Sequence, residues 1–325
     1  MSFDSALSTQ HSAPLFSIVI PNWNGWRFLP VCLDALKNQT YPNVEVIIVD
    51  NASTDGSQEA IRRDYPWVKL IDLPENRGFT GACNAGMQAA QGEFVALLNN
   101  DTEADSGWVA AVVDAFKRHP EIGSVASKML LFDKRDHIHT AGDYFTRAGK
   151  PGNRGVWQAD MGQFDHEEYV FSACGGSSVY RKALLDQIGL LDDDFFFSLE
   201  DVDLGWRAQL SGWRCLYTPA AIVYHHLSAT GGGVTASYYD GRNLIFVLVK
   251  DLPSAYWRSY GGRIIRAQVR LAWEALRAWR GAAARARLRG MIAGLGGIPR
   301  MLKKRRIVQA QRKLSDADVE ALLSE

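Results

Sequence analysis

The chain has 325 residues, of which 47% are hydrophobic and 22% charged, so its composition excludes a disordered, collagenous or disulfide-stapled protein. Its 36 basic and 36 acidic residues give a formal net charge of zero. The charges are unevenly placed, because residues 1–250 carry 20 Lys and Arg against 30 Asp and Glu, whereas residues 251–325 carry 16 against 6.

The N-terminal segment and the cysteines indicate a cytoplasmic protein. Residues 1–14 have neither the cationic nor the apolar part of a secretion signal, and we expect them to form a disordered leader. The four cysteines are far apart and have no CxxC spacing, which favours reduced thiols over a zinc site or a disulfide framework. The longest apolar run, Leu244 to Val249, is far shorter than the roughly 18 residues that cross a bilayer, so any membrane contact is expected to be peripheral.

Short runs rich in β-branched residues alternate with helical segments in the first 118 residues, a pattern typical of βαβ units that build a mostly parallel sheet. The predicted strands are residues 16–21, 44–50, 67–73 and 93–99. The predicted helices are residues 26–39, 57–63, 80–91 and 107–118. We therefore expect an α/β fold with helices flanking a central sheet.

The alternation of strands and helices weakens between residues 121 and 170. There we expect irregular structure that lies over the sheet and forms a loop facing an acceptor substrate. Order returns afterwards, with a segment approaching the sheet, two helices and a strand at residues 172–179, 181–189, 200–212 and 220–225. The chain beyond Tyr238 is predicted to be helical. We divide the whole chain after its leader into a catalytic domain, residues 15–250, and a basic helical C-terminal region, residues 251–325.

Polar residues follow four predicted strands, at the edge where open α/β sheets bind ligands. The segments read PNWNG, DNASTDGS, ENRGFTGACNAG and NNDTE. Asp50 stands where a carboxylate can accept hydrogen bonds from a base or ribose, although Asp50, Asn51 and Asp55 are also typical turn and cap residues. No Walker-type phosphate loop and no GxGxxG follows the first strand, so phosphates need another partner. A divalent cation on Asp101, with Asn99 nearby, would neutralise them.

The segments SIVIPNWNG, VEVIIVDNASTDGS, ENRGFTGACNAGM, ALLNNDTE, EDVDLGWR and VYHH, in this order, resemble the successive motifs of family 2 glycosyltransferases. These are inverting enzymes with the GT-A nucleotide-diphospho-sugar transferase fold, and the resemblance covers roughly residues 15–250. It is greatest to the rhamnosyltransferase-like subgroup of bacterial cell-surface polysaccharide synthesis. It implies transfer of L-rhamnose from dTDP-rhamnose to a polysaccharide or lipid-linked glycan. The alternatives are a UDP- or GDP-sugar donor, a non-catalytic nucleotide-sugar-binding scaffold, or a nucleotidyltransferase.

The resemblance also implies roles for individual residues. The donor nucleotide would lie near Pro21, Asn22, Asn24, Asp50, Asn76, Arg77 and Asn100. NNDTE resembles the metal motif of the family, which makes Asp101 the principal ligand of Mg²⁺ or Mn²⁺, with Asn99 as a weaker ligand. A further ligand would be His225, with His226 as the alternative.

The general base implied by the resemblance is Asp201, with Glu200 adjacent, although these two and Asp203 can also simply complement the dipole of the helix that they begin. A second pair of histidines, His137 and His139, has metal-like spacing. No third ligand is evident near that pair, and we expect a surface or acceptor-loop role for it.

The basic C-terminal region predicts a cationic amphipathic helix over residues 263–280. Arginines 263, 266, 270 and 277 project from one face, and Ile264, Ile265, Ala272, Ala275, Leu276 and Trp279 from the other. Residues 258–313 carry 16 basic residues and one acid, Glu274. We expect this region to bind the anionic inner face of the cell membrane, where the resemblance places lipid-linked acceptors. Packing on the catalytic domain and a homodimer are alternatives, and the absence of a recognition motif argues against nucleic acid.

Overall fold

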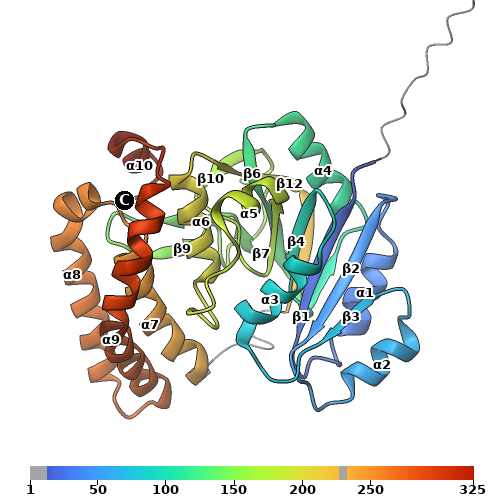
Figure 1. The fold of residues 1–325 in the computed structure, drawn as a ribbon, viewed down its shortest axis with the longest axis horizontal. Helices are drawn as coiled ribbons and strands as arrows, with labels where there is room; N and C mark the ends of the chain where they lie inside the picture. Colours follow the sequence, from blue (N-terminus) through green and yellow to red (C-terminus); the bar gives the residue numbers. More distant parts are fainter. Residues whose placement is uncertain (1–12, 227–232) are drawn as a thin grey trace, which may run out of the picture.

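Figure 1 shows the fold of the computed structural model, which describes residues 13–226 and 233–325. The predicted disordered leader lies outside the described residues except for Ala13 and Pro14. The strands are β1 (Phe16–Asn22), β2 (Val44–Asp50), β3 (Lys69–Asp72), β4 (Phe94–Leu98), β5 (Thr102–Ala104), β6 (Ile122–Leu131), β7 (Lys134–Ala141), β8 (Asp143–Phe145), β9 (Pro151–Asn153), β10 (Glu168–Val170), β11 (Ser177–Arg181) and β12 (Arg214–His225). The helices are α1 (Leu29–Lys37), α2 (Ser57–Asp64), α3 (Gly78–Ala89), α4 (Trp108–Arg118), α5 (Lys182–Ile188), α6 (Glu200–Leu210), α7 (Gly233–Lys250), α8 (Ser254–Arg277), α9 (Ala282–Ala310) and α10 (Asp316–Ala321).

The central sheet has the order β10-β12-β6-β11-β4-β1-β2-β3, with β5 beside β12 and β7 beside β6. Strands β4, β1, β2 and β3 run parallel to one another, and the register pairs Asn22 with Asp50. The carboxyl ends of these strands therefore lie at one edge, where parallel sheets bind ligands. The other half is mixed, because β12 is parallel to β6 whereas β11, β10, β5 and β7 are antiparallel to their neighbours.

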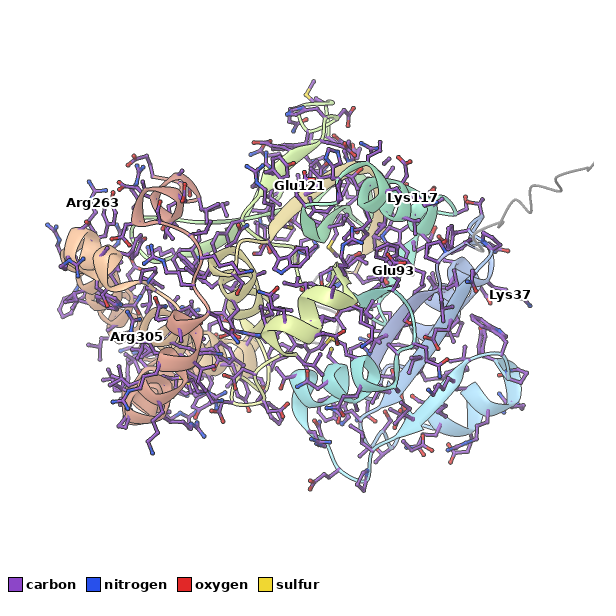
Figure 2. The ribbon with its side chains drawn as sticks, turned by 45° about the horizontal axis from the view of Figure 1, so that its top comes forward. Lys37, Glu93, Lys117, Glu121, Arg263 and Arg305 are labelled. Atoms are coloured by element: carbon purple, nitrogen blue, oxygen red, sulfur yellow. The ribbon has the colours of Figure 1, made fainter. Side chains whose placement is uncertain are left out.

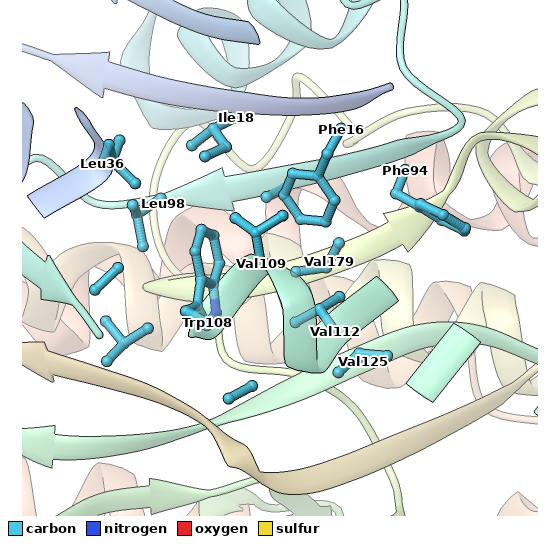
Figure 3. Close-up of a cluster of buried hydrophobic side chains, with 14 of the residues drawn as sticks. Phe16, Ile18, Leu36, Phe94, Leu98, Trp108, Val109, Val112, Val125 and Val179 are labelled. Atoms are coloured by element: carbon cyan, nitrogen blue, oxygen red, sulfur yellow. The ribbon is translucent and has the colours of Figure 1, made fainter. Parts of the chain in front are cut away.

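Helices cover both faces of the parallel half because its strands send apolar side chains to both sides. Phe16 and Ile18 of β1 pack with Trp108 of α4 on one face (Figure 3), whereas Val19 packs with Met87 of α3 on the other. Successive residues of a strand point to opposite faces, so a continuous apolar run indicates a strand buried on both. The predicted α/β fold is confirmed, and the elements predicted in the first 118 residues are present with ends shifted by a few residues.

The expectation of irregular structure between residues 121 and 170 is wrong, because this segment supplies five strands. The longest, β6, lies inside the sheet between β11 and β12 and is buried over all but its last residue. It includes a buried lysine, Lys128, whose ammonium lies 2.6 Å from Asp160 and 2.7 Å from Asp165. Strand β12 also begins before the predicted residue 220, at Arg214, and is irregular between Thr218 and Ile222.

The described chain after Tyr238 is helical apart from short connections and the final residues, as predicted, and its helices share a core with α6 and β8. Trp206 of α6 and Phe145 of β8 belong to the same buried cluster as Phe246 of α7, Met301 of α9 and Leu323 near the C-terminus. The division into a catalytic domain and a C-terminal region therefore stays a prediction. Within the two described ranges, no helix has both the length and the apolarity to cross a bilayer.

Helix α8 has three distinct faces instead of the two that were predicted. Ile264 and Ala275 of the predicted apolar face point inward and are buried. Five large apolar side chains lie on the surface instead, at Ile265, Val269, Trp273, Leu276 and, just beyond the helix, Trp279. Arginines 266, 270 and 277 are exposed beside this apolar stripe. Figure 2 shows Arg263 and Arg305 at the helical end of the molecule. The packing alternative thus accounts for one part of the predicted apolar face and leaves the other uncovered.

Candidate active site

Hydrogen bonds join three polar strand ends of the parallel half into one network. The Asn22 amide donates to Asp50 over 2.9 Å, and the Asn100 amide donates to the Asn22 side-chain oxygen over 2.8 Å. Asp50 is completely buried and also accepts from the Ser53 backbone and from Gln58. Asp50 thus has the contacts of a turn residue, and its predicted contact with a donor nucleotide stays a prediction.

The other predicted donor residues lie around this network. Pro21 is half-buried in β1, and Asn24 is exposed with a left-handed φ of 52°. Asn76 and Arg77 are exposed just before α3. They are held by a residue outside the predicted set, Asn51, which donates to the Asn76 side chain over 2.9 Å and accepts from the Arg77 backbone over 2.8 Å. The sequence motif after β2 already contained Asn51, but only as a turn residue.

The predicted cation ligands meet after β4 and at the end of β12. Asp101 is 2% exposed, and its Oδ1 lies 3.1 Å from Nε2 of His225. The Asn99 amide nitrogen lies 3.3 Å from the same ring nitrogen. His226 instead stacks on Phe132, with ring centroids 3.6 Å apart. Of the two neighbouring histidines, His225 is therefore the one placed with Asp101 and Asn99.

A further histidine stands behind His225. Nδ1 of His139 lies 3.1 Å from Nδ1 of His225 in the protein interior, so the expected surface role of His139 is wrong. His137 is half-buried and contacts exposed Asp136. Burial, together with the neighbouring His225, lowers the pKa of His139 to about 3, so its ring is neutral at pH 7. A neutral His139 can accept the Nδ1 proton of His225, which leaves the Nε2 lone pair of His225 directed at Asp101.

This arrangement fits a divalent cation. A lone pair on His225 Nε2 and the carboxylate of Asp101 would repel each other at 3.1 Å unless a proton or a cation lay between them. One nitrogen and one or more oxygens form a donor set that Mn²⁺ accepts, and Mg²⁺ accepts it when other oxygens complete the shell. Metal-bound histidines usually donate their second ring proton to a neighbour, and His139 is placed to accept it.

The predicted base and its neighbour begin helix α6. Half-buried Asp201 accepts the Gly175 backbone N–H on Oδ2 over 2.7 Å and the Val202 N–H on Oδ1 over 2.7 Å. Glu200 is buried, and its Oε2 has no hydrogen-bond partner among the described residues. Burial raises the pKa of both carboxyls, and the charge of Asp201 raises the pKa of Glu200 further. Burial thus disfavours the charged form of both carboxyls, and more causes act on Glu200 than on Asp201, which leaves Asp201 as the better candidate for the base.

Two consecutive glycines bring the base and the cation ligands together. The Gly176 carbonyl accepts the Asn99 backbone N–H over 3.0 Å, and a Cβ added to Gly176 would lie 3.6 Å from the His225 ring. A Cβ added to Gly175 would lie 3.2 Å from Asp201 Oδ2. The sequence showed this segment only as one that approaches the sheet.

A third carboxyl, Asp143 at the start of β8, lies beside Asp201. Side-chain ligand atoms of Asp143, Asp201 and Cys174 all lie within 4.8 Å of one another. Asp143 accepts hydrogen bonds from Thr140 over 3.1 Å and from Asn153 over 2.7 Å. Burial, and secondarily the charge of Asp201, raises the pKa of Asp143 to about 8. Asp143 was not predicted because it lies in the segment that we expected to be irregular.

The comparison with protein families decides the identity of the chain. Residues 17–189 match the sequence model of glycosyl transferase family 2. This chain is a member of glycosyl transferase family 2. The family 2 enzyme is similar to the N-acetylglucosaminyl-diphospho-decaprenol L-rhamnosyltransferase of Mycobacterium tuberculosis, with 28% identity over 251 residues that span 70% of this chain and 81% of the relative. It is also similar to the O-antigen biosynthesis protein RfbC of Myxococcus xanthus, with 30% identity over 231 residues. These residues span 67% of this chain and 18% of that protein.

Solved structures confirm that this family 2 enzyme has the GT-A fold. One is a mannosyltransferase from Pyrobaculum calidifontis, solved with GDP-Man and Mn²⁺. The superposition covers 96% of this chain and 79% of the mannosyltransferase chain, with a TM-score of 0.54 and 18% sequence identity. Another is the structure of residues 1–349 of S. aureus TarS. The superposition covers 91% of this chain and 90% of the TarS chain, with a TM-score of 0.56 and 17% sequence identity. The enzyme is thus a glycosyltransferase, as the sequence motifs implied.

Proposed function

We propose that this glycosyltransferase inverts the donor anomeric carbon as it transfers L-rhamnose from dTDP-rhamnose to a cell-surface polysaccharide or a lipid-linked glycan. The observation that carries the proposal is that Asp201 and the pair Asp101–His225 meet across two consecutive glycines. The choice of sugar and acceptor is supported by the name of the mycobacterial relative, an L-rhamnosyltransferase for N-acetylglucosaminyl-diphospho-decaprenol.

In this proposal Asp201 acts as the general base. It removes the proton from an acceptor hydroxyl as that oxygen attacks the anomeric carbon, and the bond to the nucleoside diphosphate breaks on the opposite face. Each oxygen of Asp201 accepts one backbone N–H, which fixes the orientation of the carboxylate. Burial and the charge of Asp201 raise the pKa values of neighbouring Glu200 and Asp143, which favours the neutral forms of these two carboxyls beside an ionised Asp201.

A divalent cation, Mg²⁺ or Mn²⁺, would be held by Asp101 and His225, with Asn99 as an additional partner. When bound it would neutralise the donor diphosphate and the charge that develops on the leaving nucleotide. The strand-end residues Asn22 and Asn100 and the exposed pair Asn76 and Arg77 would contact the nucleotide. Mn²⁺ in the solved mannosyltransferase complex supports a cation in this fold.

A donor panel tests the proposed function. We expect dTDP-rhamnose with Mn²⁺ or Mg²⁺ to raise the melting temperature, because a ligand that binds only the native state stabilises it. We also expect transfer of rhamnose to a lipid-diphosphate-linked N-acetylglucosamine in a radiolabel assay. Turnover of a UDP- or GDP-sugar instead would overturn the rhamnose assignment. Donor binding without transfer to any acceptor would favour the non-catalytic scaffold.

We further propose that the enzyme works at the cytoplasmic face of the cell membrane, bound through residues 258–313. The exposed stripe of Ile265, Val269, Trp273 and Leu276 on α8 offers an apolar surface for the lipid interface. Exposed arginines beside it match the negative charge of anionic lipids, and each cation near such a surface contributes about 1 kcal/mol.

Liposome flotation tests this surface. We expect the wild type to float with anionic liposomes at low salt and to dissociate at high salt, and the double variant Val269→Ser/Trp273→Ser to bind several-fold more weakly. Trp157→Ser is the matched control, because Trp157 is 61% exposed, close to the 60% of Trp273, but lies outside the basic region. Wild-type protein that ignores the liposomes, or a double variant that floats equally well, would favour the dimer or packing alternative. Size-exclusion chromatography would identify a dimer.

A further inference from the structure

The backbone that leads into the base-bearing helix α6 has a left-handed conformation at three non-glycine residues. The φ angles are 63° at Phe196, 68° at Ser198 and 63° at Leu199, which is the N-cap of α6. Side chains other than glycine seldom adopt this conformation, and it persists where surrounding contacts hold it, often at functional sites. The next two residues are Glu200 and Asp201, so this backbone sets the position of the base.

Helix α7 holds this backbone with a buried amide. The Nδ2 atom of Asn243, which has no solvent exposure, lies 3.0 Å from the Phe195 carbonyl, 2.8 Å from that of Phe197 and 2.7 Å from that of Ser198. Its two protons are therefore shared among three carbonyl oxygens. The Asn243 side-chain oxygen in turn accepts from Arg242 over 2.9 Å, and Arg242 also donates to the Phe195 carbonyl over 2.6 Å.

The same segment also contacts the donor side of the site. The Phe196 carbonyl accepts the Thr80 backbone N–H over 3.2 Å. Gly78 has a φ of 72°, and a Cβ there would collide with the Phe196 carbonyl oxygen. The left-handed segment thus lies between α7 and the start of α3. Helix α3 begins directly after Asn76 and Arg77, two of the predicted donor residues. A shift of this segment would change the position of the base relative to the donor.

Helix α7 also contacts α6 itself, through the last residue of α7, Lys250. The Lys250 ammonium lies 2.5 Å from Asp203 and 2.6 Å from Asp192. Lys250 thus holds the first turn of α6, two residues beyond Asp201, whereas the Asn243 amide contacts the segment before that turn. Loss of the Asn243 amide would therefore release the left-handed segment on the N-terminal side of Asp201 while Asp203 stays attached to Lys250.

We propose that Asn243 is a positioning residue for glycosyl transfer. It holds the left-handed segment before α6 and so fixes where the Asp201 carboxylate meets the acceptor hydroxyl. The proposal rests on the proposed function of Asp201 as the base. A misplacement of about 1 Å at a reacting group can cost roughly 100-fold in rate, so loss of this amide should act on turnover.

The test compares Asn243→Ala with Gln209→Ala. Gln209 is a matched control on α6 itself, because its buried amide also donates to backbone carbonyls, those of Val170 at 3.2 Å and Phe171 at 2.8 Å. We expect Asn243→Ala to lower kcat about 10- to 100-fold while the donor KM changes less than about threefold, and Gln209→Ala to keep kcat within about threefold. Melting temperatures of both variants show how much stability each loses.

Equal losses of kcat in the two variants, at equal losses of melting temperature, would overturn the positioning role. If Asn243→Ala does not fold, Asn243→Ser keeps one hydroxyl donor and is subject to the same comparison. A double-mutant cycle with Asp201→Asn separates the two proposals. If Asn243 acts through Asp201, its replacement costs little more in that background, whereas additive losses would overturn the positioning role alone. Full transfer by Asp201→Asn would overturn the base assignment instead.

Discussion

Asp201→Asn is expected to lower kcat at least about 100-fold while donor binding survives. The asparagine side chain keeps the shape of the carboxylate, and its oxygen can still accept the Gly175 backbone N–H that Asp201 accepts at 2.7 Å. It cannot take a proton from the acceptor hydroxyl. A positioned general base contributes about 10²- to 10⁴-fold, so kcat should fall by at least that lower factor. The measurements are kcat at saturating donor and a calorimetric titration with the nucleotide sugar.

The pH dependence gives an independent check on Asp201. Burial raises its pKa, and a base must be ionised to act, so the wild-type rate should fall as the pH drops through a value above the ordinary range of an aspartate. Asp186→Asn is a suitable control, because that carboxyl is exposed on α5 and pairs with Lys182 on the same helix. Near-normal turnover by Asp201→Asn would show that another group is the base.

Asp101→Ala is expected to remove the cation-dependent part of donor binding. Asp101 is the only carboxylate among the three predicted ligands, and its oxygen lies 3.1 Å from His225 Nε2. Loss of even an indirect partner of a metal commonly costs 10- to 100-fold in affinity, so loss of this carboxylate should cost at least about 10-fold. Calorimetric titration of the nucleotide sugar with and without Mn²⁺ measures the difference.

Two comparisons make that experiment specific. Asp101→Asn removes the charge but keeps the side-chain volume at this buried position, so it separates loss of the cation from loss of packing. His226→Ala is the neighbouring control, since the His226 ring stacks on Phe132 and should matter little for the cation. An Asp101→Ala variant with an unchanged Mn²⁺-dependent titration would remove Asp101 from the set of ligands.

The meeting of Asn22, Asp50 and Asn100 at one edge of the sheet was predictable because each of them is placed by its own local strand motif. Strands β1, β2 and β4 each contain a short apolar run, and Asn22, Asp50 and Asn99 stand at the ends of these runs or directly after them. Parallel strands in neighbouring positions then bring these ends to one edge without help from distant segments. The order of motifs therefore carried most of the information about this half.

The other half depends on contacts between distant residues. Strand β6 includes Gly123, Ser127 and Lys128, which do not read as a buried strand, and Lys128 is tolerated because Asp160 and Asp165 approach it. Burial of a charge without such partners is strongly unfavourable, and the partners are more than 30 residues away. Asp143 and His139 were misjudged for the same reason, since their neighbours Asp201 and His225 are brought to them only by the completed sheet.

The C-terminal helices were predicted as helices, but their orientation was not. Ile264 and Ile265 are adjacent in the sequence, yet the first is completely buried and the second 58% exposed. The choice depends on which elements approach α8: Ile264 packs in one cluster with Leu248 of α7, and a Cβ on Gly149 would lie 3.3 Å from Ile264 and 2.7 Å from Leu248. Helical periodicity locates an apolar face, whereas the depth of each residue depends on such close approaches.

The last residues of the chain share a core with α6, and this limits which variants can test membrane binding by the C-terminal region. The Ser324 backbone N–H donates to the Phe145 carbonyl over 3.0 Å, and Leu323 packs in the cluster that encloses Trp206. A chain cut after Lys250 would lose the residues that cover Trp206, and large cavities of this kind commonly prevent folding. If such a fragment were inactive, the cause would be an unfolded active site. The result would not test whether residues 258–313 bind a membrane. Point variants on the exposed stripe of α8 leave the shared core intact and are the informative reagents.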